Sequence, residues 1–597
     1  MRHDARVTRH GPRLIVAVAC AIVVLMYVTN HDMAGKPDAP RGTGQYLPIL
    51  DRGDGHMMYL MARSTAIDLD WVFDNDLARF GDPWNEPRTT TGRKSIVQPI
   101  GPALVWTPLI WVSVAGAWVV DRFGADIPLH GYTLWTERFV FLSSALFACA
   151  AVLLGLGLAR RLGAGRWARA YAAAAVLLGT SLTYYATYMP SYAHAMDAAV
   201  CAALIAWWAH TIGRTDWKRW VVFGALLGIA ALIRVQDFSL GLIVVVELAF
   251  KRDRKIIIGG AIALGVSLLV FVPQLVEWHL VFGKALALPQ GPHYTRPTSP
   301  MILELLWSPR NGWIVTTPIV WAGLIGLALI PREHRIIAAG LIAVVVIQIY
   351  LNSTIADWWG SASYGQRRLC SVTLPLVVGH ACLLTRLRRA RWPWAQHAAV
   401  AVVFGTLVVI NLVRVWNLRG GRGAPSEMRT TCCAGLPGFA QPLYDIAGNP
   451  LELPASALFA IRHGVSLARW DQVAGDYPLT PPFGAFRDDT LKGAHATWFP
   501  PGHFLVGDWS AKQTSERPFR TTTAGTILVP NLMPYAQKIG VWVRGAVTVT
   551  WDGDDVAHGT DAWSRVEFTV SPSTGTHELG FSGRADVGQI DFVLLGP

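Results

Sequence analysis

Long apolar blocks are the feature that most constrains this chain. Ten such blocks, together with an apolar run near the N-terminus, approach the length that a helix needs to cross a hydrocarbon core of about 30 Å. They cover residues 14–28, 135–158, 170–188, 193–213, 219–236, 238–250, 256–281, 313–331, 336–351, 369–385 and 395–413. Only 15% of the residues are charged, too few to cover these blocks with polar surface in water. The sequence therefore predicts a polytopic α-helical membrane protein with about eleven transmembrane helices.

Basic residues gather in six short clusters between these blocks. The clusters are Arg2/Arg6/Arg9/Arg13, Arg160/Arg161/Arg166/Arg169, Arg214/Lys218/Arg219, Lys251/Arg252/Arg254/Lys255, Arg332/Arg335 and Arg386/Arg388/Arg389/Arg391. Such clusters mark cytoplasmic loops, so the net charge of +12 indicates orientation rather than nucleic-acid binding. With all six inside, we predict a multi-pass protein of the cytoplasmic (inner) membrane, with a cytoplasmic N-terminus and a periplasmic or extracellular C-terminal domain. No small-residue cleavage site precedes Asn30, so the first run is interpreted as a retained anchor.

The apolar block Ile100–Val120 is ambiguous, because its length alone would allow it to span. A span here would move every later basic cluster to the outer side. Pro102 and Pro108 also favour an irregular segment. We therefore expect a juxtamembrane or re-entrant helix within a first outer loop at residues 30–134.

The run Val221–Phe250 has basic clusters at both of its ends. One long helix would place those clusters on opposite sides of the membrane, so we expect a hairpin of two short spans. Arg234, Gln236 and Asp237 would then lie at its outer tip.

An acidic segment, GDGHMMYLMARSTAIDLDWVFDND at residues 53–76, follows the first apolar run. A helix drawn through it places His56, Tyr59 and Arg63 on one polar arc and methionines on the opposite side. We expect this helix to lie on the bilayer surface with its apolar side down. Asp54 stands just before its first turn, where a carboxylate either caps the helix or serves in catalysis.

Four further stretches accompany this aspartate: ARSTAIDLDWVFDND, QPIGPALVWTPL, VPQLVEWHLVFGKAL and LLWSPRNGWIVTTP. In this combination, residues of about 10–415 resemble the bacterial branch of the GT-C glycosyltransferases. Dolichyl-phosphate-mannose protein mannosyltransferases and the lipid A aminoarabinose transferase are relatives in that superfamily. The resemblance implies an inverting membrane enzyme that moves a hexosyl or pentosyl group from a polyprenyl-phosphate-linked sugar. The acceptor would be an extracytoplasmic cell-wall or surface glycan, a lipid or a protein.

The same resemblance implies that Asp54 is the acidic residue at the reaction centre. Many family members carry Asp-Glu at this point, whereas this chain reads Asp54-Gly55. A metal or second-carboxylate role is therefore not carried over. No cofactor is certain, and whether the protein uses a divalent metal stays open.

Sugar transfer from a lipid phosphate requires a base for the acceptor hydroxyl and cations for the leaving phosphate. A lone carboxylate outside the membrane suits the first requirement, and we assign it to Asp54. For the phosphate, arginine binds oxygen pairs in bidentate fashion and stays charged near lipid. The candidates on outer loops are Arg367, Arg310, Arg296 and Lys94. Each taken alone fits a role in binding headgroups or in setting topology better. Arg367 and Arg310 are favoured for the phosphate, since each lies where an outer loop re-enters the membrane beside Gly and aromatic residues.

Rings and hydrogen-bonding side chains on the same loops are candidates for sugar or acceptor binding. They are His56, Tyr59, Tyr192, His194, Trp358, Trp359 and Tyr364. Two alternatives stay open: His194 could pair with Asp197 to stabilise the bundle, and the tryptophans could belong to an interfacial aromatic belt.

The composition changes near Arg419, where blocks of spanning length end. Short alternating segments separated by Gly, Asp, Ser and Pro predict an extracytoplasmic β-rich domain at residues 418–597, after a catalytic membrane domain at 1–417. We expect a β-sandwich of jelly-roll or carbohydrate-binding-module type. It could hold an acceptor glycan on Trp509, Trp542, Trp551 or Trp563, or cap the outer loops. Cys432 and Cys433 are candidates for a vicinal disulfide.

A non-enzymatic membrane protein is the alternative. It would be a transporter or flippase of lipid-linked glycan, or a scaffold for surface polysaccharide. Paired interrupted spans are typical of transporters, and no such internal repeat is visible here. The polar residues also gather at one face rather than at mid-membrane, which favours the enzyme.

Overall fold

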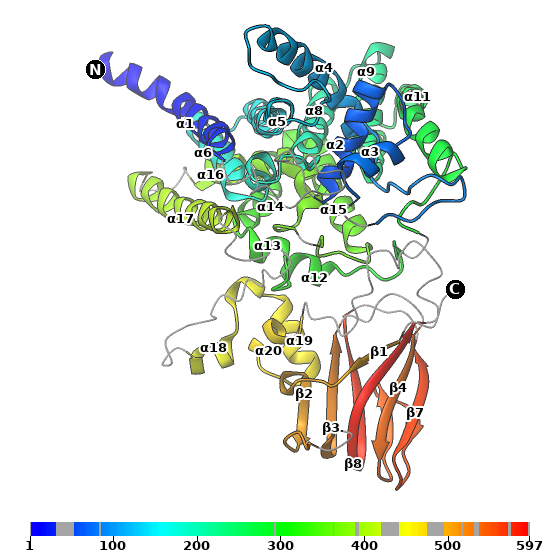
Figure 1. Cartoon of the computed structure of the whole chain (residues 1–597). Helices are drawn as coiled ribbons and strands as arrows, with labels where there is room; N and C mark the ends of the chain where they lie inside the picture. The colour runs from blue at the N-terminus through cyan, green and yellow to red at the C-terminus, as the bar shows by residue number, and fades with distance from the viewer. Residues whose placement is uncertain are drawn as a thin grey trace. The chain divides into compact units, whose positions relative to one another are not determined.

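The computed structural model divides into two compact units, a helical one and one that contains the strands (Figure 1). The first unit comprises residues 1–289, 317–349 and 366–425, and the second comprises 290–316, 350–365 and 426–597. The structure describes residues 2–30, 53–82, 85–291, 294–361, 363–387, 393–419, 441–474, 495–514, 518–530, 537–570 and 575–594. Cys432 and Cys433 lie outside the described residues.

Among the described residues, seven helical segments are long and apolar enough to cross a membrane. The helices in them are α1 (Arg2–Val28), α4 (Gly101–Asp121), α5 (Leu134–Arg161), α11 (Arg254–Phe282), α15 (Arg335–Ser353), α16 (Thr373–Leu387) and α17 (Pro393–Arg419). The remaining predicted blocks form shorter helices, namely α6 (Arg166–Gly179), α8 (His194–Thr211), α9 (Trp217–Ile233), α10 (Leu242–Lys251) and α14 (Val320–Leu327). The polytopic helical fold is thus confirmed.

Helix α4 corresponds to the ambiguous block. It is one continuous helix of 21 residues, it includes Pro108, and it is long and apolar enough to span. The helix does not turn back within this block. Its expected juxtamembrane position stays a prediction. The membrane orientation inferred from the basic clusters stays a prediction.

The predicted hairpin is confirmed at α9 and α10. Helix α9 ends at Ile233, and a 3₁₀ turn, Val235–Gly241, leads into α10. Arg219 near the start of α9 forms a buried ion pair with Glu247 of α10. The two helices can share this contact only because the chain turns back on itself.

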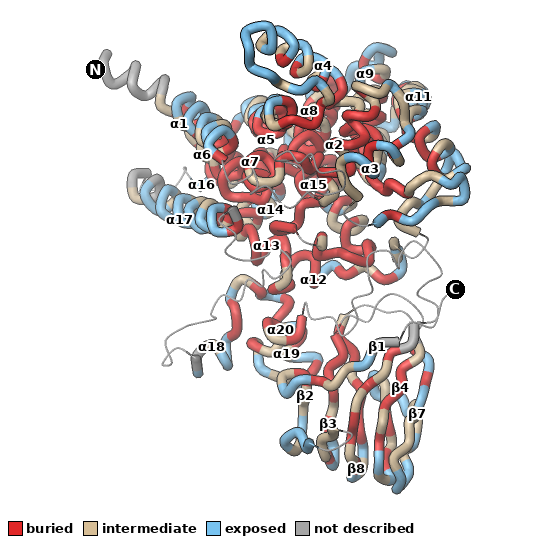
Figure 2. The backbone as a smooth tube through the Cα atoms, in the orientation of Figure 1, coloured by how far each residue is buried: buried red, intermediate tan, exposed pale blue. Residues whose placement is uncertain are grey.

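Buried residues concentrate in the inner helices of the first unit, whereas α1, α4 and α17 carry many exposed residues (Figure 2). Glycines allow the closest approach between α14 and α16. A Cβ atom on Gly326 would lie 1.8 Å from the carbonyl oxygen of Gly379, and one on Gly379 would lie 1.9 Å from that of Gly323. Small residues at membrane-helix contacts let backbones touch in this way.

The second unit contains an antiparallel sheet in which β2, β3, β8, β4 and β7 lie in that order. The strands are β1 (His495–Trp498), β2 (Leu505–Trp509), β3 (Arg520–Pro530), β4 (Gln537–Arg544), β5 (Thr548–Trp551), β6 (Asp554–His558), β7 (Ser564–Val570) and β8 (Thr576–Leu594). The long strand β8 pairs with β1, β3, β4 and β5. Alternate residues such as Ile539, Val541 and Val543 enter one apolar core, as the period of a strand requires. The predicted β-rich domain is confirmed.

Two loops from residues 290–316 and 350–365 belong to this second unit, although the sequence analysis places them in the membrane domain. The Ala356 backbone N–H donates to the carbonyl oxygen of Tyr294 at 2.9 Å, and Ala356 joins the core of the sheet. Trp470 of α20 (Ala468–Val473) donates to the carbonyl oxygen of Trp307 at 3.0 Å. Both loops are therefore integral parts of the second unit.

Candidate functional site

The carboxylate of Asp54 forms an ion pair inside the helical unit. Asp54 is the first residue of α2 (Asp54–Arg63), and Arg367 begins the 3₁₀ turn Arg367–Val372 before α16. Arg367 Nη1 lies 2.7 Å from Asp54 Oδ2, and Gln98 Nε2 donates to Asp54 Oδ1 at 3.3 Å. The Asp54 side chain is 23% exposed and that of Arg367 is 9% exposed. The N-cap residue of α2 is Gly53, and Asp54 is the acidic residue of its first turn. Both interpretations of Asp54, capping and catalysis, stay predictions.

Tyr192 lies against the same arginine. The guanidinium carbon of Arg367 is 5.2 Å from the centre of the Tyr192 ring, which is within the range of a cation–π contact. Asp54 and Arg367 are the charged groups that act on the Tyr192 phenol. Burial, followed by the negative charge of Asp54, raises the pKa of Tyr192 to about 12. The phenol is therefore neutral at pH 7, and its ring lies against the guanidinium of Arg367.

His194 extends this cluster towards a second arginine. Its Nδ1 lies 3.0 Å from Arg234 Nη1, and its ring meets Tyr185 edge-on at 4.7 Å. Because a guanidinium only donates, Nδ1 must accept, and the ring is the neutral Nε2–H tautomer. The structure thus pairs His194 with Arg234, and the alternative pairing with Asp197 is wrong.

Gly55 is packed closely against Ser191. A Cβ atom on Gly55 would lie 2.1 Å from Ser191 Oγ and 2.9 Å from the Ser191 carbonyl carbon. No side chain fits in this space unless the backbone beside Tyr192 moves. The packing around α2 therefore excludes a glutamate at position 55.

His56 and Tyr59 hold α2 within the fold. His56 Nε2 lies 3.0 Å from the carbonyl oxygen of Gly81, and the Tyr59 hydroxyl donates to that of Gly131 at 2.5 Å. Both side chains are buried, as are Met57 and Met61 on the other side of the helix. The expectation of a helix lying on the bilayer surface is therefore wrong, because the polar arc faces hydrogen-bonding backbone instead of water.

Lys94 is committed to the first loop. Its Nζ lies 3.0 Å from Asp82 Oδ2 and donates to the carbonyl oxygen of Glu86 at 2.7 Å. The contacts with Asp82 and Glu86 are therefore enough to hold the Lys94 side chain in place without a bound phosphate. A phosphate-binding role for Lys94 stays a prediction.

The other predicted residues, Arg296, Arg310, Trp358, Trp359 and Tyr364, belong to the second unit. The guanidinium carbon of Arg310 lies 4.8 Å from the centre of the Trp359 ring, and the Arg296 backbone N–H donates to the Thr354 carbonyl oxygen at 2.8 Å. Trp358 and Tyr364 are fully buried, and Trp359 is 6% exposed. The three rings are therefore buried, whereas Arg296 and Arg310 are only half-buried. The proposed binding of donor or sugar by these residues stays a prediction.

The four tryptophans predicted as a glycan platform divide between two environments. Trp509 and Trp551 pack against the apolar core, whereas the Trp542 indole donates to Asp591 Oδ2 at 3.2 Å. Trp563 lies under the guanidinium of Arg544, 5.2 Å from its carbon. A glycan platform on these rings stays a prediction.

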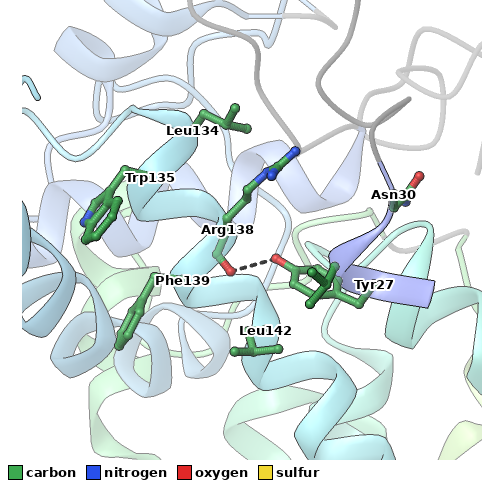
Figure 3. A pocket seen from close by; sticks show the side chains of 8 residues that line it. Tyr27, Asn30, Leu134, Trp135, Arg138, Phe139 and Leu142 are labelled. Carbon is green, nitrogen blue, oxygen red and sulfur yellow. Dashed lines mark hydrogen bonds between the residues drawn. The ribbon is translucent and has the colours of Figure 1, made fainter. Parts of the chain in front are cut away.

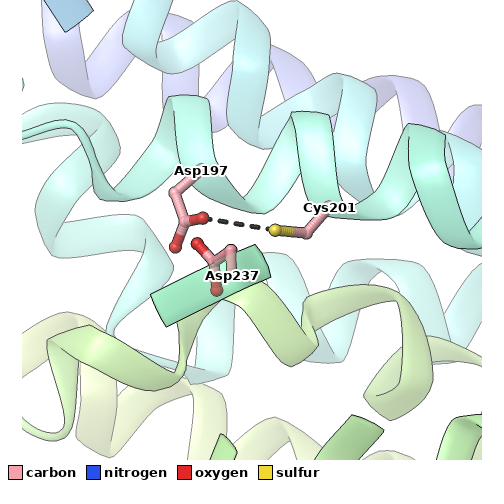
Figure 4. Close-up of side chains that lie close together, drawn as sticks. All are labelled: Asp197, Cys201 and Asp237. Carbon is pink, nitrogen blue, oxygen red and sulfur yellow. Dashed lines mark hydrogen bonds between the residues drawn. The ribbon is translucent and has the colours of Figure 1, made fainter. Parts of the chain in front are cut away.

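One group of acidic and sulfur side chains among the described residues is compact enough to hold a metal ion. Asp197 and Cys201 of α8 and Asp237 of the 3₁₀ turn Val235–Gly241 are all buried, and their ligand atoms lie within 4.8 Å of one another (Figure 4). Cys201 Sγ donates to Asp197 Oδ1 at 3.3 Å, and Gln348 Nε2 donates to Asp237 Oδ1 at 2.9 Å. By donor type, these residues fit a divalent cation, which would neutralise the two carboxylates. Asp54 is not part of this group.

Sequence reasoning left two residues of the cluster out of the site. Gln98 lies in the stretch QPIGPALVWTPL, where an uncharged amide gave no chemical signal of its own. Arg234 was placed at the tip of the hairpin, but nothing in the sequence connects it with His194, 40 residues away. A polar residue that interrupts an apolar run was the signal available for Arg234.

No family model and no curated protein sequence matches this chain. Among solved structures, ArnT from Cupriavidus metallidurans is 16% identical over 72% of this chain and 74% of its own length, with a TM-score of 0.40. The archaeal oligosaccharyltransferase AglB from Archaeoglobus fulgidus is 12% identical over 79% of this chain and 62% of its own length, with a TM-score of 0.45. The arabinosyltransferase EmbB from Mycobacterium smegmatis is 11% identical over 97% of this chain, which spans 64% of EmbB, with a TM-score of 0.35. At these low TM-scores, we base the functional proposal on the chain's own residues.

Proposed function

We propose that this chain is an integral-membrane, inverting glycosyltransferase of GT-C type. It would move a sugar from a polyprenyl-phosphate donor to an extracytoplasmic glycan, lipid or protein. The observation that carries the proposal is the largely buried pair of Asp54 and Arg367, which joins a carboxylate to a cation that could bind phosphate at one point of the helical unit. Sequence resemblance over residues of about 10–415 supports the same assignment.

Asp54 is the base in this scheme. The acceptor hydroxyl would replace the long contact from Gln98 at Oδ1, while Arg367 keeps its hold on Oδ2. The acceptor oxygen would then attack the anomeric carbon from the face opposite the phosphate, and its proton would pass to Asp54. A positioned base of this kind contributes about 10²–10⁴ in rate.

Arg367 stabilises the leaving group. As the bond between the anomeric carbon and the phosphate oxygen breaks, that oxygen keeps the electron pair, and its charge develops beside the guanidinium. Tyr192 supports the guanidinium from one side and stays neutral, so it adds no competing anion. His194, which is neutral, and the charged Arg234 lie next to this cluster, where they would bind sugar hydroxyl groups.

The test is donor consumption by the purified full-length protein in lipid, with a panel of polyprenyl-phosphate sugars and a crude acceptor extract. Wild type should consume one donor, and Asp54→Asn should lose about 10²–10⁴ of that rate. Asp121→Asn removes an exposed aspartate at the end of α4 and serves as the matched control. Equal consumption by wild type and Asp54→Asn would exclude Asp54 as the base. No consumption of any donor by wild type would favour a transporter or a scaffold.

A further inference from the structure

An apolar groove lies between the end of α1 and the beginning of α5 (Figure 3). It has a volume of about 490 Å³ and is lined by Val28 of α1 and by Trp135, Phe139 and Leu142 of α5, among others. Trp135 and Phe139 are each 41% exposed, so their rings form an open wall rather than a packed core. This groove lies within the first unit and contains none of the residues of the Asp54 cluster.

The walls of the groove are held together by hydrogen bonds. The Tyr27 hydroxyl donates to the backbone carbonyl oxygen of Arg138 at 2.7 Å, which ties α1 to α5 (Figure 3). The Asn30 side-chain amide donates to the carbonyl oxygen of Thr187 at 2.9 Å, which ties the end of α1 to α7 (Leu182–Thr187). The groove is therefore preformed, and a ligand would bind without reorganising these helices.

Among the described residues, Arg138 is the one charged residue that lines the groove. Within the described part of the chain, no ion pair and no hydrogen bond of its guanidinium is recorded, and the Tyr27 phenol is its electrostatic neighbour. Figure 3 shows this side chain extending away from Phe139 and Leu142. Arg138 lies about one turn into α5, and Tyr27 lies one residue before the end of α1, so the groove opens near a membrane surface. A cation at this depth, above apolar walls, matches the phosphate and acyl chain of a lipid.

We propose that this groove is a specific site for one anionic glycerophospholipid. Its phosphate binds the guanidinium of Arg138, and one acyl chain lies along Trp135, Phe139 and Leu142. A phospholipid is preferred to the sugar donor, because Arg138 is a second cation, outside the cluster of Asp54 and Arg367. The site would therefore hold a lipid that stabilises the junction of α1 and α5, and it does not depend on the proposed transferase activity.

Native mass spectrometry of the full-length protein in detergent tests the site. With phosphatidylglycerol added, wild type should retain one lipid molecule, and with phosphatidylcholine it should retain less. Arg138→Gln should weaken retention of phosphatidylglycerol about fivefold, as expected for one surface cation facing an anionic lipid. Arg138→Lys should retain most of it. Arg122→Gln is the matched control, since Arg122 follows the apolar helix α4 and stacks on Trp118 outside the groove.

Thermal unfolding gives a second readout. Phosphatidylglycerol should raise the melting temperature of wild type and of Arg122→Gln but not that of Arg138→Gln, and all three should melt alike without added lipid. Equal retention of both phospholipids, or unchanged retention by Arg138→Gln, would overturn the proposal. One-for-one displacement of phosphatidylglycerol by a polyprenyl phosphate would assign the groove to the donor instead.

Discussion

Asp54 Oδ2 and Arg367 Nη1 lie 2.7 Å apart, although 313 residues separate them in the chain. Asp54 begins a helix that follows the first apolar run, and Arg367 precedes α16, which is almost entirely buried in the bundle. The pair therefore forms only when the first loop docks on the assembled helices. The two residues therefore form a coupled unit, and substituting both together tests whether they act as one.

A double-mutant cycle should show this coupling. Asp54→Asn and Arg367→Gln should each lower kcat/KM for the donor by about 10²–10³ or more, because one removes the base and the other removes the cation for the leaving phosphate. The double variant should lose little more than the worse single variant, as residues that act as a unit are not additive. Losses that multiply would show that the two act independently. Arg88→Gln, an exposed loop arginine that is 62% exposed, is the control.

Tyr192 variants should separate the ring from the phenol. Tyr192→Phe keeps the ring against Arg367 and should lose only a few-fold in activity. Tyr192→Leu removes the cation–π contact and should raise the KM for the donor about tenfold, given a contribution of about 1–2 kcal/mol for a desolvated contact. Tyr171→Leu on α6 provides the control. If both Tyr192 variants behaved alike, the ring would have no role in holding the guanidinium.

Gly55→Ala should damage the site out of proportion to the size of the change. The added Cβ must displace Ser191, next to Tyr192, so we expect at least a tenfold fall in activity, with a smaller effect on melting temperature. Gly157→Ala is the matched control, because its Cβ would meet nothing within 4 Å. Adding Ser191→Gly to Gly55→Ala should restore part of the activity, since it removes the side-chain clash. Full activity of Gly55→Ala would contradict the packing argument.

Asp76 should make stability depend on pH. Burial raises the pKa of Asp76 from its usual 3.8 to about 6, and the attraction of Arg63, 2.8 Å away, offsets this only in part. Because the folded-state pKa is raised, the stability contributed by the protonated group is complete below about 3.8 and is lost as the pH rises through about 6. The melting temperature of wild type relative to Asp76→Asn should therefore fall between pH 4 and pH 7. A relative melting temperature that rises or stays constant over this range would contradict the shift.

Hydropathy and charge predicted the membrane helices closely. The blocks 135–158 and 256–281 became α5 at Leu134–Arg161 and α11 at Arg254–Phe282, and basic clusters at both ends identified the hairpin. Periodicity gave the wrong position for α2. A polar arc has the same sequence pattern whether it faces water or buried acceptors such as the Gly131 carbonyl oxygen. The helical period of polar residues shows that one face of a helix is polar, but not what that face contacts.

The candidate site was predictable only residue by residue. Asp54 and Arg367 were each identifiable from their positions on outer loops, but no local pattern links residues so far apart in the chain. The engagement of Lys94 with Asp82 also depends on a loop conformation that composition does not encode. Likewise, apolar patterning could not assign the loops 290–316 and 350–365 to the second unit, because that assignment comes from tertiary contacts with the sheet.

The pairing of β8 has a consequence for biosynthesis. The second unit takes residues from 290–316 and 350–365, and four of its strands pair with β8, which is made after them. As the ribosome synthesises the chain in order, the early loops emerge long before their partners exist. Strands β3, β4 and β5 can pair earlier with β2, β7 and β6, but their edges towards β8 stay open until β8 is made, and β1 has no other partner among the described strands. Chaperones or proteases can recognise such open edges. Maturation of this protein is therefore gated by its final strand, and a stalled or truncated nascent chain would leave the second unit unfinished even with every membrane helix inserted.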